Sequence, residues 1–369
     1  MMRLAIKNLL QERGRLVTSI GGVAASLLLL IMLDGIFAGV SEQIVAYPQK
    51  AGADVWVMQE GVSNMHMASS VLPGGLGANI ASVEGVRSVT PVLYTNGFVE
   101  ASGRRWFSYI VGIPPGVTYG GPWAMARGER APESGTVVLP DVIARKSGIE
   151  VGDEVVVLGR GFRVSGLSAE TFSLANSITF MRDADLERLL SSPGVVSYFL
   201  VKAQPGVAPG QLAARIASQA PGTNAMTREA FVASDRSMAQ QMGVDIIQVM
   251  TLIGSVIGVL IISLTMYTAT ARRAREFGVA KAIGTSNFQL FLVVGVQALA
   301  VVAAGLGLAV GLSYALRPLV GSLMPEIALL YVADNLARVA VAAIAISVVS
   351  SILPAWRIAR VDPATVFKE

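Results

Sequence analysis

Four long stretches without a charged side chain constrain this fold more than any other feature of the sequence. They are residues 16–33, 246–271, 282–316 and 339–356. A hydrocarbon core about 30 Å thick requires about 20 apolar residues in a helix that rises about 1.5 Å per residue. Only 15% of the 369 residues are charged, whereas soluble domains average about a quarter. We therefore expect an α-helical membrane protein with four transmembrane helices.

The first apolar stretch follows Arg3, Lys7, Arg13 and Arg15, an arrangement that a cleaved secretory signal also shows. Its apolar part is longer than the usual core of a signal peptide, and the small-residue cleavage pattern is poor near Phe37. We therefore expect a retained transmembrane helix.

The distribution of Lys and Arg predicts which segments face the cytoplasm, where these residues collect in short loops. Residues 1–15 contain four bases and one acid, and so does the segment 272–287. By contrast, residues 41–245 contain 16 basic and 18 acidic side chains. We expect both termini and the 272–287 segment in the cytoplasm, and the large region outside. The net charge of +4 then reflects the inner membrane face and does not indicate nucleic-acid binding.

The large region alternates short β-type runs with turns, which predicts an α+β domain inserted between transmembrane helices 1 and 2. Gly159 to Gly161 is expected to form a hairpin turn, Asp141 to cap a helix, and the residues after Thr227 to form a helical stalk. Strands are predicted at 54–59, 86–99, 106–112, 135–140, 154–158, 162–166, 177–181 and 198–203, and helices at 141–147, 184–190 and 210–219.

Catalytic and metal sites are not expected in this chain. It has no cysteine, and its single histidine, His66, is flanked by Met65 and Met67 in a stretch predicted to be a flexible loop tip. A copper site there is the alternative. The glycine-rich run 73–77 lacks the Gly-Lys-Ser/Thr ending of a phosphate-binding loop, so no nucleotide site is predicted.

Two acidic features have both a structural and a functional interpretation. Asp183, Asp185 and Glu187 are expected to begin a helix, where acids favour the dipole; a divalent cation site is the alternative. Asp34 lies about 18 residues into the first span, near the expected outer interface. Solvation there is favoured over a proton relay, although an acid within a span is a functional hypothesis by default.

Glycines along the third span indicate close helix packing. Gly307 and Gly311 form a GxxxG pattern, which lets two backbones approach. The pattern fits either a dimer contact or packing between the third and fourth spans of one chain.

A short amphipathic helix is predicted between the second and third spans. Phe277, Ala280 and Ile283 fall on one face, and Gly284 is expected to end the helix. Ser286 or Asn287 can cap the next helix. Such an element can dock a cytoplasmic partner, or it can lie on lipid headgroups as a positively charged loop.

At these residues the chain resembles the FtsX/MacB-type permease family of ABC transporters. The segment 272–284 is similar to the coupling element of that family, and the tail 354–364 (PAWRIARVDPA) to its closing signature. Residues 52–55 (GADV) and 137–167 are similar to its periplasmic core. The resemblance covers essentially the whole chain.

The resemblance implies a permease subunit that is not itself an enzyme and holds no cofactor, because ATP and Mg are bound by a separate cytoplasmic ATPase subunit. It implies a bacterial inner-membrane protein, a permease homodimer, and a substrate such as a lipid, lipoprotein, peptide or drug. A periplasmic adaptor and an outer-membrane duct can complete the path. The residues expected to bind the ATPase are Arg272, Arg275, Glu276, Phe277, Gly278, Lys281, Ala282 and Gly284.

The same family includes a second functional class, a signalling scaffold that transports nothing and activates a cell-wall hydrolase. The scaffold type has a longer cytoplasmic N-terminal tail and a smaller outer domain. A tail of 15 residues and an outer region of about 200 residues therefore favour transport.

The sequence therefore predicts nine consecutive segments. They are a cytoplasmic N-terminal amphipathic segment (1–15), transmembrane helix 1 (16–40), an extracytoplasmic domain with its stalk (41–243), transmembrane helix 2 (244–271), a cytoplasmic coupling helix (272–287), transmembrane helix 3 (288–316), a short outer loop (317–335), transmembrane helix 4 (336–356) and a cytoplasmic tail (357–369).

Because the chain has no native cysteine, single introduced cysteines report the topology directly. Cysteines at Ser102 and Ser322 should react with an impermeant maleimide in intact cells. Cysteines at Ser286 and Thr365 should react only after the cytoplasmic side is opened. Labelling at Ser286 from outside would contradict the predicted coupling segment.

Overall fold

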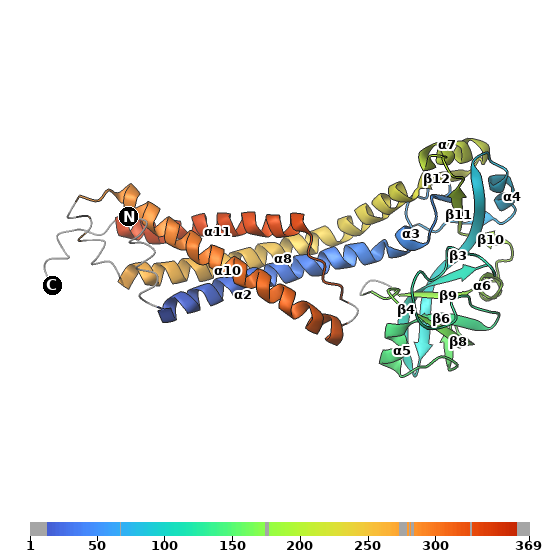
Figure 1. The fold of residues 1–369 in the computed structure, drawn as a ribbon, viewed down its shortest axis with the longest axis horizontal. Coiled ribbons are helices and arrows are strands. Elements are labelled where there is room, and N and C mark those ends of the chain that lie inside the picture. Colours follow the sequence, from blue (N-terminus) through green and yellow to red (C-terminus); the bar gives the residue numbers. More distant parts are fainter. Residues whose placement is uncertain are drawn as a thin grey trace. The chain divides into compact units, whose positions relative to one another are not determined.

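The computed structural model describes residues 13–66, 68–173, 177–272, 279, 281, 284–324 and 327–359. It separates into two compact units, each of which is described by itself (Figure 1). The helical unit comprises Met1–Gly39, Gly243–Met324 and Leu329–Glu369. The β-rich unit comprises Val40–Met242 and Pro325–Ala328.

Four long helices supply the helical unit: α2 (Arg13–Ile44), α8 (Arg228–Arg272), α10 (Asn287–Leu323) and α11 (Ala333–Ala359). Within the described residues, two of their segments are long and apolar enough to cross a membrane, Leu16–Ile44 and Phe288–Leu323. A shorter apolar segment, Leu252–Ile261, lies in α8. Helix α10 continues seven residues past the predicted end at 316 and includes Arg317 and Pro318. The predicted loop 317–335 therefore shrinks to residues 324–332.

Small residues let the helices of this unit approach one another closely. A Cβ atom at Gly305 of α10 would lie 2.6 Å from Val23 Cγ1 of α2, and one at Gly254 of α8 would lie 2.7 Å from Leu30 Cδ2. By contrast, nothing among the described residues lies within 4 Å of a Cβ placed at Gly307 or Gly311. Within the described residues, the glycines of the predicted GxxxG pattern therefore make no such close approach to α11.

The loop between α10 and α11 packs on helix α2 at Gly35. The backbone N–H of Leu330 donates to the Gly35 carbonyl at 3.1 Å, and the hydroxyl of Tyr331 donates to the Ser313 carbonyl at 3.0 Å. Beside it, Asp34 Oδ1 lies 4.0 Å from a guanidinium nitrogen of Arg338. Asp34 thus has a cationic partner in addition to the solvation predicted for it.

The β-rich unit is an α+β domain whose elements lie within two residues of those predicted wherever a strand or helix was expected. Its strands are β1 (Val55–Gln59), β2 (Leu72–Pro73), β3 (Val86–Ala101), β4 (Arg104–Ile113), β5 (Met125–Gly128), β6 (Thr136–Pro140), β7 (Glu154–Val157), β8 (Arg160–Ser168), β9 (Ile178–Arg182), β10 (Val195–Val196), β11 (Tyr198–Ala203) and β12 (Thr223–Thr227). Its short helices are α3 (Ala46–Lys50), α4 (Leu76–Ala81), α5 (Asp141–Ser147), α6 (Asp183–Leu190) and α7 (Pro209–Gln219).

Strand β3 joins two parts of one mixed sheet, whose order is β12-β1-β11-β3-β4-β9-β6-β8-β5 with β7 bridging β3 and β8. Its first half pairs with β11 and its second half with β4. The pairs β4–β9 and β6–β8 are parallel, and the others are antiparallel. A single 16-residue strand therefore holds both parts of the sheet in one register.

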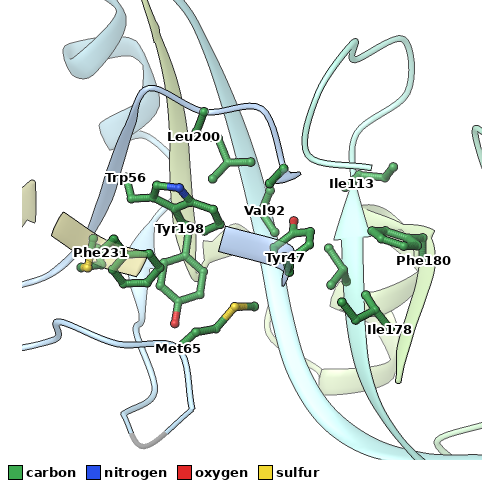
Figure 2. Packing of buried hydrophobic residues seen from close by; sticks show 14 of the residues in the cluster. Tyr47, Trp56, Met65, Val92, Ile113, Ile178, Phe180, Tyr198, Leu200 and Phe231 are labelled. Carbon is green, nitrogen blue, oxygen red and sulfur yellow. The ribbon is translucent and has the colours of Figure 1, made fainter. Parts of the chain in front are cut away.

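Alternation along β1 feeds two different cores, because successive strand residues point to opposite faces. Val55 and Val57 join the cluster that includes residues of α7, whereas Trp56 and Met58 join a second, aromatic-rich cluster (Figure 2). All four side chains are buried. A strand covered on both faces explains why its first four residues (VWVM) are continuously apolar, whereas Gln59 at its end is exposed.

One predicted helix cap, Asp141, and one predicted hairpin turn, Gly159 to Gly161, are wrong. The residue that precedes α5 is Pro140, and the Asp141 carboxylate instead pairs with Arg145 one turn later at 2.5 Å. The β7–β8 hairpin turns at Leu158 and Gly159, both with positive φ, so that Arg160 already pairs with Val157. This two-residue turn matches the twist of the strands.

Close backbone approach between β5 and β8 makes Gly166 a sensitive position. A Cβ there would overlap the backbone carbonyl of Glu129. We expect Gly166→Ala to destabilise the folded protein by about 1–3 kcal/mol, the usual cost of overpacking. The matched control is Gly210→Ala in helix α7, where a Cβ meets nothing within 4 Å. Thermal unfolding in detergent, followed by tryptophan fluorescence, should show a lower Tm for Gly166→Ala only.

Candidate functional site at the base of helix α8

The predicted ATPase-binding segment is described only at its ends. Arg275, Glu276, Phe277, Gly278 and Ala282 lie outside the described residues. The other predicted residues lie at the two ends of the segment. Arg272 is the last residue of α8, and Gly284 has a φ of +96° with its N–H donating to the Lys281 carbonyl at 2.9 Å.

The helix that follows begins where the sequence predicted. Ser286 is its N-cap: the Ser286 side chain accepts from the backbone N–H of Gln289 at 3.3 Å. The Gln289 side chain accepts from the backbone N–H of Ser286 at 3.1 Å, which completes a capping box. The segment thus ends at a left-handed glycine followed by a reciprocal cap.

The opposite end of α8 is buried in the β-rich unit. Helix α8 begins at Arg228, directly after β12, and its first turns carry Phe231 into the aromatic-rich cluster. The ring of Phe231 stacks on Trp56, with centroids 4.9 Å apart (Figure 2). Trp56 in turn meets Tyr47 of α3 edge-on at 5.8 Å. Aromatic pairs of this kind add about 0.5–1.5 kcal/mol to their burial, so the helix start is firmly attached to the sheet.

One turn later, Asp235 connects α8 to the loop that follows β1. Asp235 is fully buried, and its Oδ1 accepts from the backbone N–H of Met65 at 3.1 Å. His66 Nδ1 lies 2.8 Å from the same oxygen, and the His66 side chain is only 14% exposed. The prediction that His66 lies at a flexible loop tip is therefore wrong, because a carboxylate distant in sequence holds it.

Tyrosines surround this buried pair. The ring of Tyr109 meets His66 edge-on at 5.3 Å and Tyr94 at 5.4 Å. Burial raises the pKa of the Tyr198 hydroxyl, and the charge of Asp235 raises it further. Burial is also the main cause that raises the pKa of Tyr94, with smaller contributions from Tyr109, Tyr198 and Asp235. Both phenols therefore stay neutral beside the Asp235 carboxylate.

A second contact ties α8 to α2. The guanidinium of Arg236 lies 2.6 Å from the Glu42 carboxylate, and both side chains are partly exposed. Since Glu42 is near the end of α2 and Arg236 near the start of α8, the two helices that enter this unit are joined beside its core. The hydroxyl of Tyr47, just after α2, donates to the Gly120 carbonyl at 2.9 Å.

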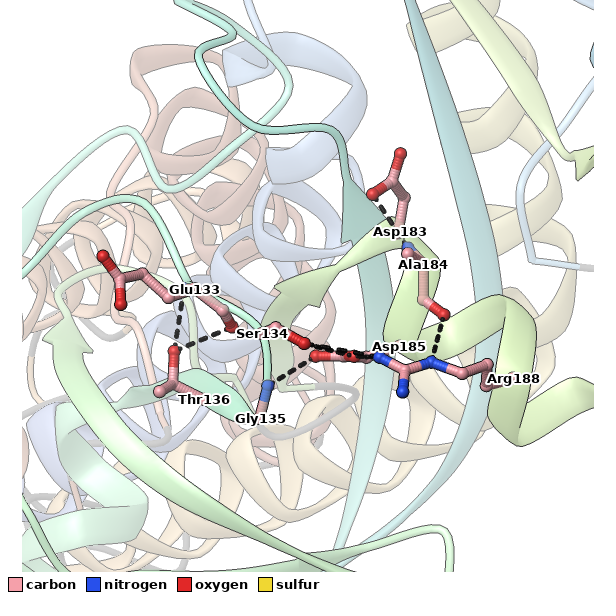
Figure 3. A network of polar contacts seen from close by, with 8 residues as sticks. All are labelled: Glu133, Ser134, Gly135, Thr136, Asp183, Ala184, Asp185 and Arg188. Atoms are coloured by element: carbon pink, nitrogen blue, oxygen red, sulfur yellow. Dashed lines mark hydrogen bonds and ion pairs between the residues drawn. The ribbon is translucent and has the colours of Figure 1, made fainter.

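The acidic start of α6 is satisfied by protein donors. Figure 3 shows Asp185 Oδ2 accepting from the backbone N–H of Gly135 at 2.7 Å, and Oδ1 accepting from Ser134 Oγ at 3.0 Å. Asp185 also pairs with Arg188 and is 5% exposed. Asp183 accepts from the N–H of Ala184, as an acid at a helix start does. This favours the structural interpretation over a divalent cation site, and the described part of the chain contains no group of three or more His, Cys, Asp or Glu that could hold a metal.

Sequence patterns had indicated the helix but not these contacts. Phe231 and Asp235 are four residues apart, so they lie on one side of α8. That spacing could have signalled a buried face within a stretch that is otherwise polar. The partners of these residues, Trp56 and His66, are about 170 residues away and could not be paired from one sequence.

Comparisons with known proteins agree with this architecture. Residues 16–219 match the MacB-like periplasmic core domain, and residues 249–363 match the FtsX-like permease C-terminal domain. The first match alone covers more than half of the chain. The chain belongs to the FtsX/MacB-type permease family of ABC transporters. It is therefore a membrane protein with an α+β extracytoplasmic domain, of the subunit class that works with an ATPase.

Relatives of this permease span its whole length. An uncharacterized ABC transporter permease of Mycobacterium tuberculosis is 26% identical over 372 residues, covering 100% of this chain and 99% of the relative. One of Mycobacterium bovis is 23% identical over 373 residues, with the same coverage.

Two solved structures are similar to part of the permease. The periplasmic region of MacB from Actinobacillus actinomycetemcomitans is 14% identical, with a TM-score of 0.38, covering 50% of this chain and 94% of that one. The extracellular domain of the noncanonic ABC-type transporter YknZ from Gram-positive bacteria is 11% identical, with a TM-score of 0.37, covering 47% and 99%.

Removing the buried carboxylate should loosen the attachment of α8. We expect Asp235→Ala to lower the free energy of unfolding by about 1–3 kcal/mol, because the Met65 N–H and His66 lose their acceptor in a buried place. Ser237→Ala is the control on the same helix, since its exposed hydroxyl donates only to the Ser234 carbonyl. Hydrogen exchange should show faster exchange in residues 62–66 of Asp235→Ala alone. Equal protection in both variants would contradict the argument.

Proposed function

We propose that this permease relays ATP-driven motion of a separate ATPase subunit to its extracytoplasmic domain. The motion serves export or extraction of a lipid, lipoprotein, peptide or drug-like substrate. In this proposal the ATPase docks on the coupling helix, residues 272–287. ATP and Mg are bound by the ATPase and not by this chain.

Helix α8 is the observation that carries the proposal. It runs without interruption from Arg228 to Arg272. Its first turns are fixed in the β-rich unit by the Phe231–Trp56 stack and by Asp235. Its last residue, Arg272, is the first residue of the predicted coupling helix. A displacement at one end of a continuous helix is transmitted along it, since changing its length would break backbone hydrogen bonds.

Four spans are part of the proposal. Helix α8 contributes the apolar segment Leu252–Ile261 in addition to the two spanning segments. Helix α11 contributes the fourth, the uncharged stretch 339–356. Exposed leucines and isoleucines occur along α8, α10 and α11, which suits helices in contact with lipid. We place the chain in the bacterial inner membrane with both termini in the cytoplasm.

A permease homodimer is the assembly that we propose. No described part of the same chain lies within 4 Å of a Cβ placed at the GxxxG residues Gly307 and Gly311. Leu308 and Leu312 beside them are exposed. Small residues permit the close backbone contact that helix pairs need in a membrane. A periplasmic adaptor and an outer-membrane duct are further partners consistent with export across an envelope.

Variants of the coupling helix test the proposed docking. Phe277→Ala should weaken association with the ATPase by about tenfold or more, since buried aromatic anchors often account for about 2 kcal/mol. Glu276→Ala should uncouple ATP hydrolysis from substrate movement. Association is measured by co-purification and binding titration, and coupling by hydrolysis and transport in the same proteoliposomes.

Arg273→Ala is the control, because a loop lying on headgroups would be as sensitive to it as a docking helix. If Phe277→Ala, Glu276→Ala and Arg273→Ala all assemble and transport like the parent, the segment is a positively charged loop and not a docking element. Activation of a cell-wall hydrolase without substrate movement would instead assign the scaffold function.

A further inference from the structure

A cavity of about 290 Å³ lies beside the loop that follows strand β4. Three segments of the β-rich unit form its wall, residues 50–52, 113–123 and 130–132. The charged residues of this wall are Lys50 and Arg130, and no Asp or Glu is among the described residues that line it. A cavity whose charged side chains are all cations favours an anionic ligand.

The wall is held in place by hydrogen bonds of the domain itself. The N–H of Gly120 donates to the Ala51 carbonyl at 2.7 Å, while the Gly120 carbonyl accepts from the Tyr47 hydroxyl at 2.9 Å. The hydroxyls of Tyr119 and Ser88 are 2.9 Å apart. A loop fixed in this way forms the cavity before a ligand arrives, as in most small-molecule sites.

Both cations contact Trp123, one at its ring and the other at its backbone carbonyl. Lys50 Nζ lies 5.6 Å from the centre of the Trp123 ring, and Arg130 donates to the Trp123 carbonyl at 3.3 Å. Ile113 and Tyr119 extend the apolar wall. The cavity thus offers cationic donors next to an apolar body of modest size, at the low end of the volumes that small ligands occupy.

A carboxylate of the chain already contacts one of these cations. A carboxylate oxygen of Glu170, which is outside the wall, lies 2.6 Å from Lys50 Nζ, and the Lys50 and Glu170 side chains are 43% and 61% exposed. The hydrogen bond from Lys50 lowers the pKa of the Glu170 carboxyl. Solvent screens an exposed ion pair and makes it weak, so a ligand carboxylate can take the place of Glu170 on Lys50.

We propose that this cavity binds an organic carboxylate with an apolar body. Its carboxylate replaces Glu170 on Lys50 and contacts Arg130, and its body lies against Trp123. The carboxylate can belong to a free small acid or to the C-terminal residue of a peptide. Binding requires no ATPase, so it can be tested whether or not the proposed transport function holds.

Fluorine NMR of the full-length protein in lipid nanodiscs tests this site. The chain has four tryptophans, and 5-fluorotryptophan labelling with Trp123→Phe assigns the resonance of Trp123. Titration with N-acetyl-phenylalanine should shift that resonance saturably. The amide of the same compound should not, because it lacks the charge. The tripeptide Ala-Ala-Phe, compared with its amide, tests the peptide source.

Four substitutions, Arg130→Met among them in combination with Lys50→Met, test the contribution of each charged side chain to binding. Lys50→Met should weaken binding about fivefold, because the exposed ion pair between Lys50 and the ligand carboxylate is lost. Glu170→Gln should strengthen it, because the competing charge is gone. Arg160→Met, a cation outside the wall, should leave it unchanged. Binding of both acids, or of either one alone, supports the site and identifies its source. Equal binding of acid and amide, no binding of either acid, or full affinity in Lys50→Met with Arg130→Met would overturn it.

Discussion

Hydrocarbon offers no hydrogen-bond partner to a backbone N–H or C=O group, and this constraint determines the secondary structure of the helical unit. Each such group must be satisfied within the segment that crosses the bilayer, so the apolar stretches become long helices. Helices in lipid gain little from burying more apolar surface against each other, and close contact depends on small residues. In α8 and α10 these are Gly254 and Gly305, which admit Leu30 and Val23 of α2.

The β-rich unit follows a different rule, because water drives its apolar side chains into a core. Strand β1 is covered on both faces, and the start of α8 is packed into the same core through Phe231. A helix fixed to a sheet by stacked aromatics and a buried carboxylate cannot rotate without breaking those contacts. The start of α8, a helix that continues to Arg272, is therefore fixed by the tertiary structure of the domain.

Two acidic residues of this domain make contacts of different strength, one buried and one exposed. Asp235 is fully buried and accepts from the Met65 N–H, so its contribution is to attachment. Glu170 is exposed and contacts Lys50, so solvent competes with that contact. Burial makes the first contact expensive to break, whereas solvent makes the second contact weak.

The sequence by itself determined the elements whose causes are local. Hydropathy runs predicted the long helices, and alternation and turn residues placed the main strands within two residues. Of the two expected caps, Ser286 and Asn287, the structure uses Ser286. Only the tertiary structure decided which distant residues meet. His66, flanked by methionines, was predicted at a flexible loop tip with a copper site as the alternative, but Asp235, 169 positions away, holds it. Likewise, Gly307 and Gly311 suggested either a dimer contact or packing between the third and fourth spans, whereas within the described chain Gly305 makes the close contact with α2. Local preference depends on a few neighbouring residues, whereas pairing across a fold depends on where whole elements pack.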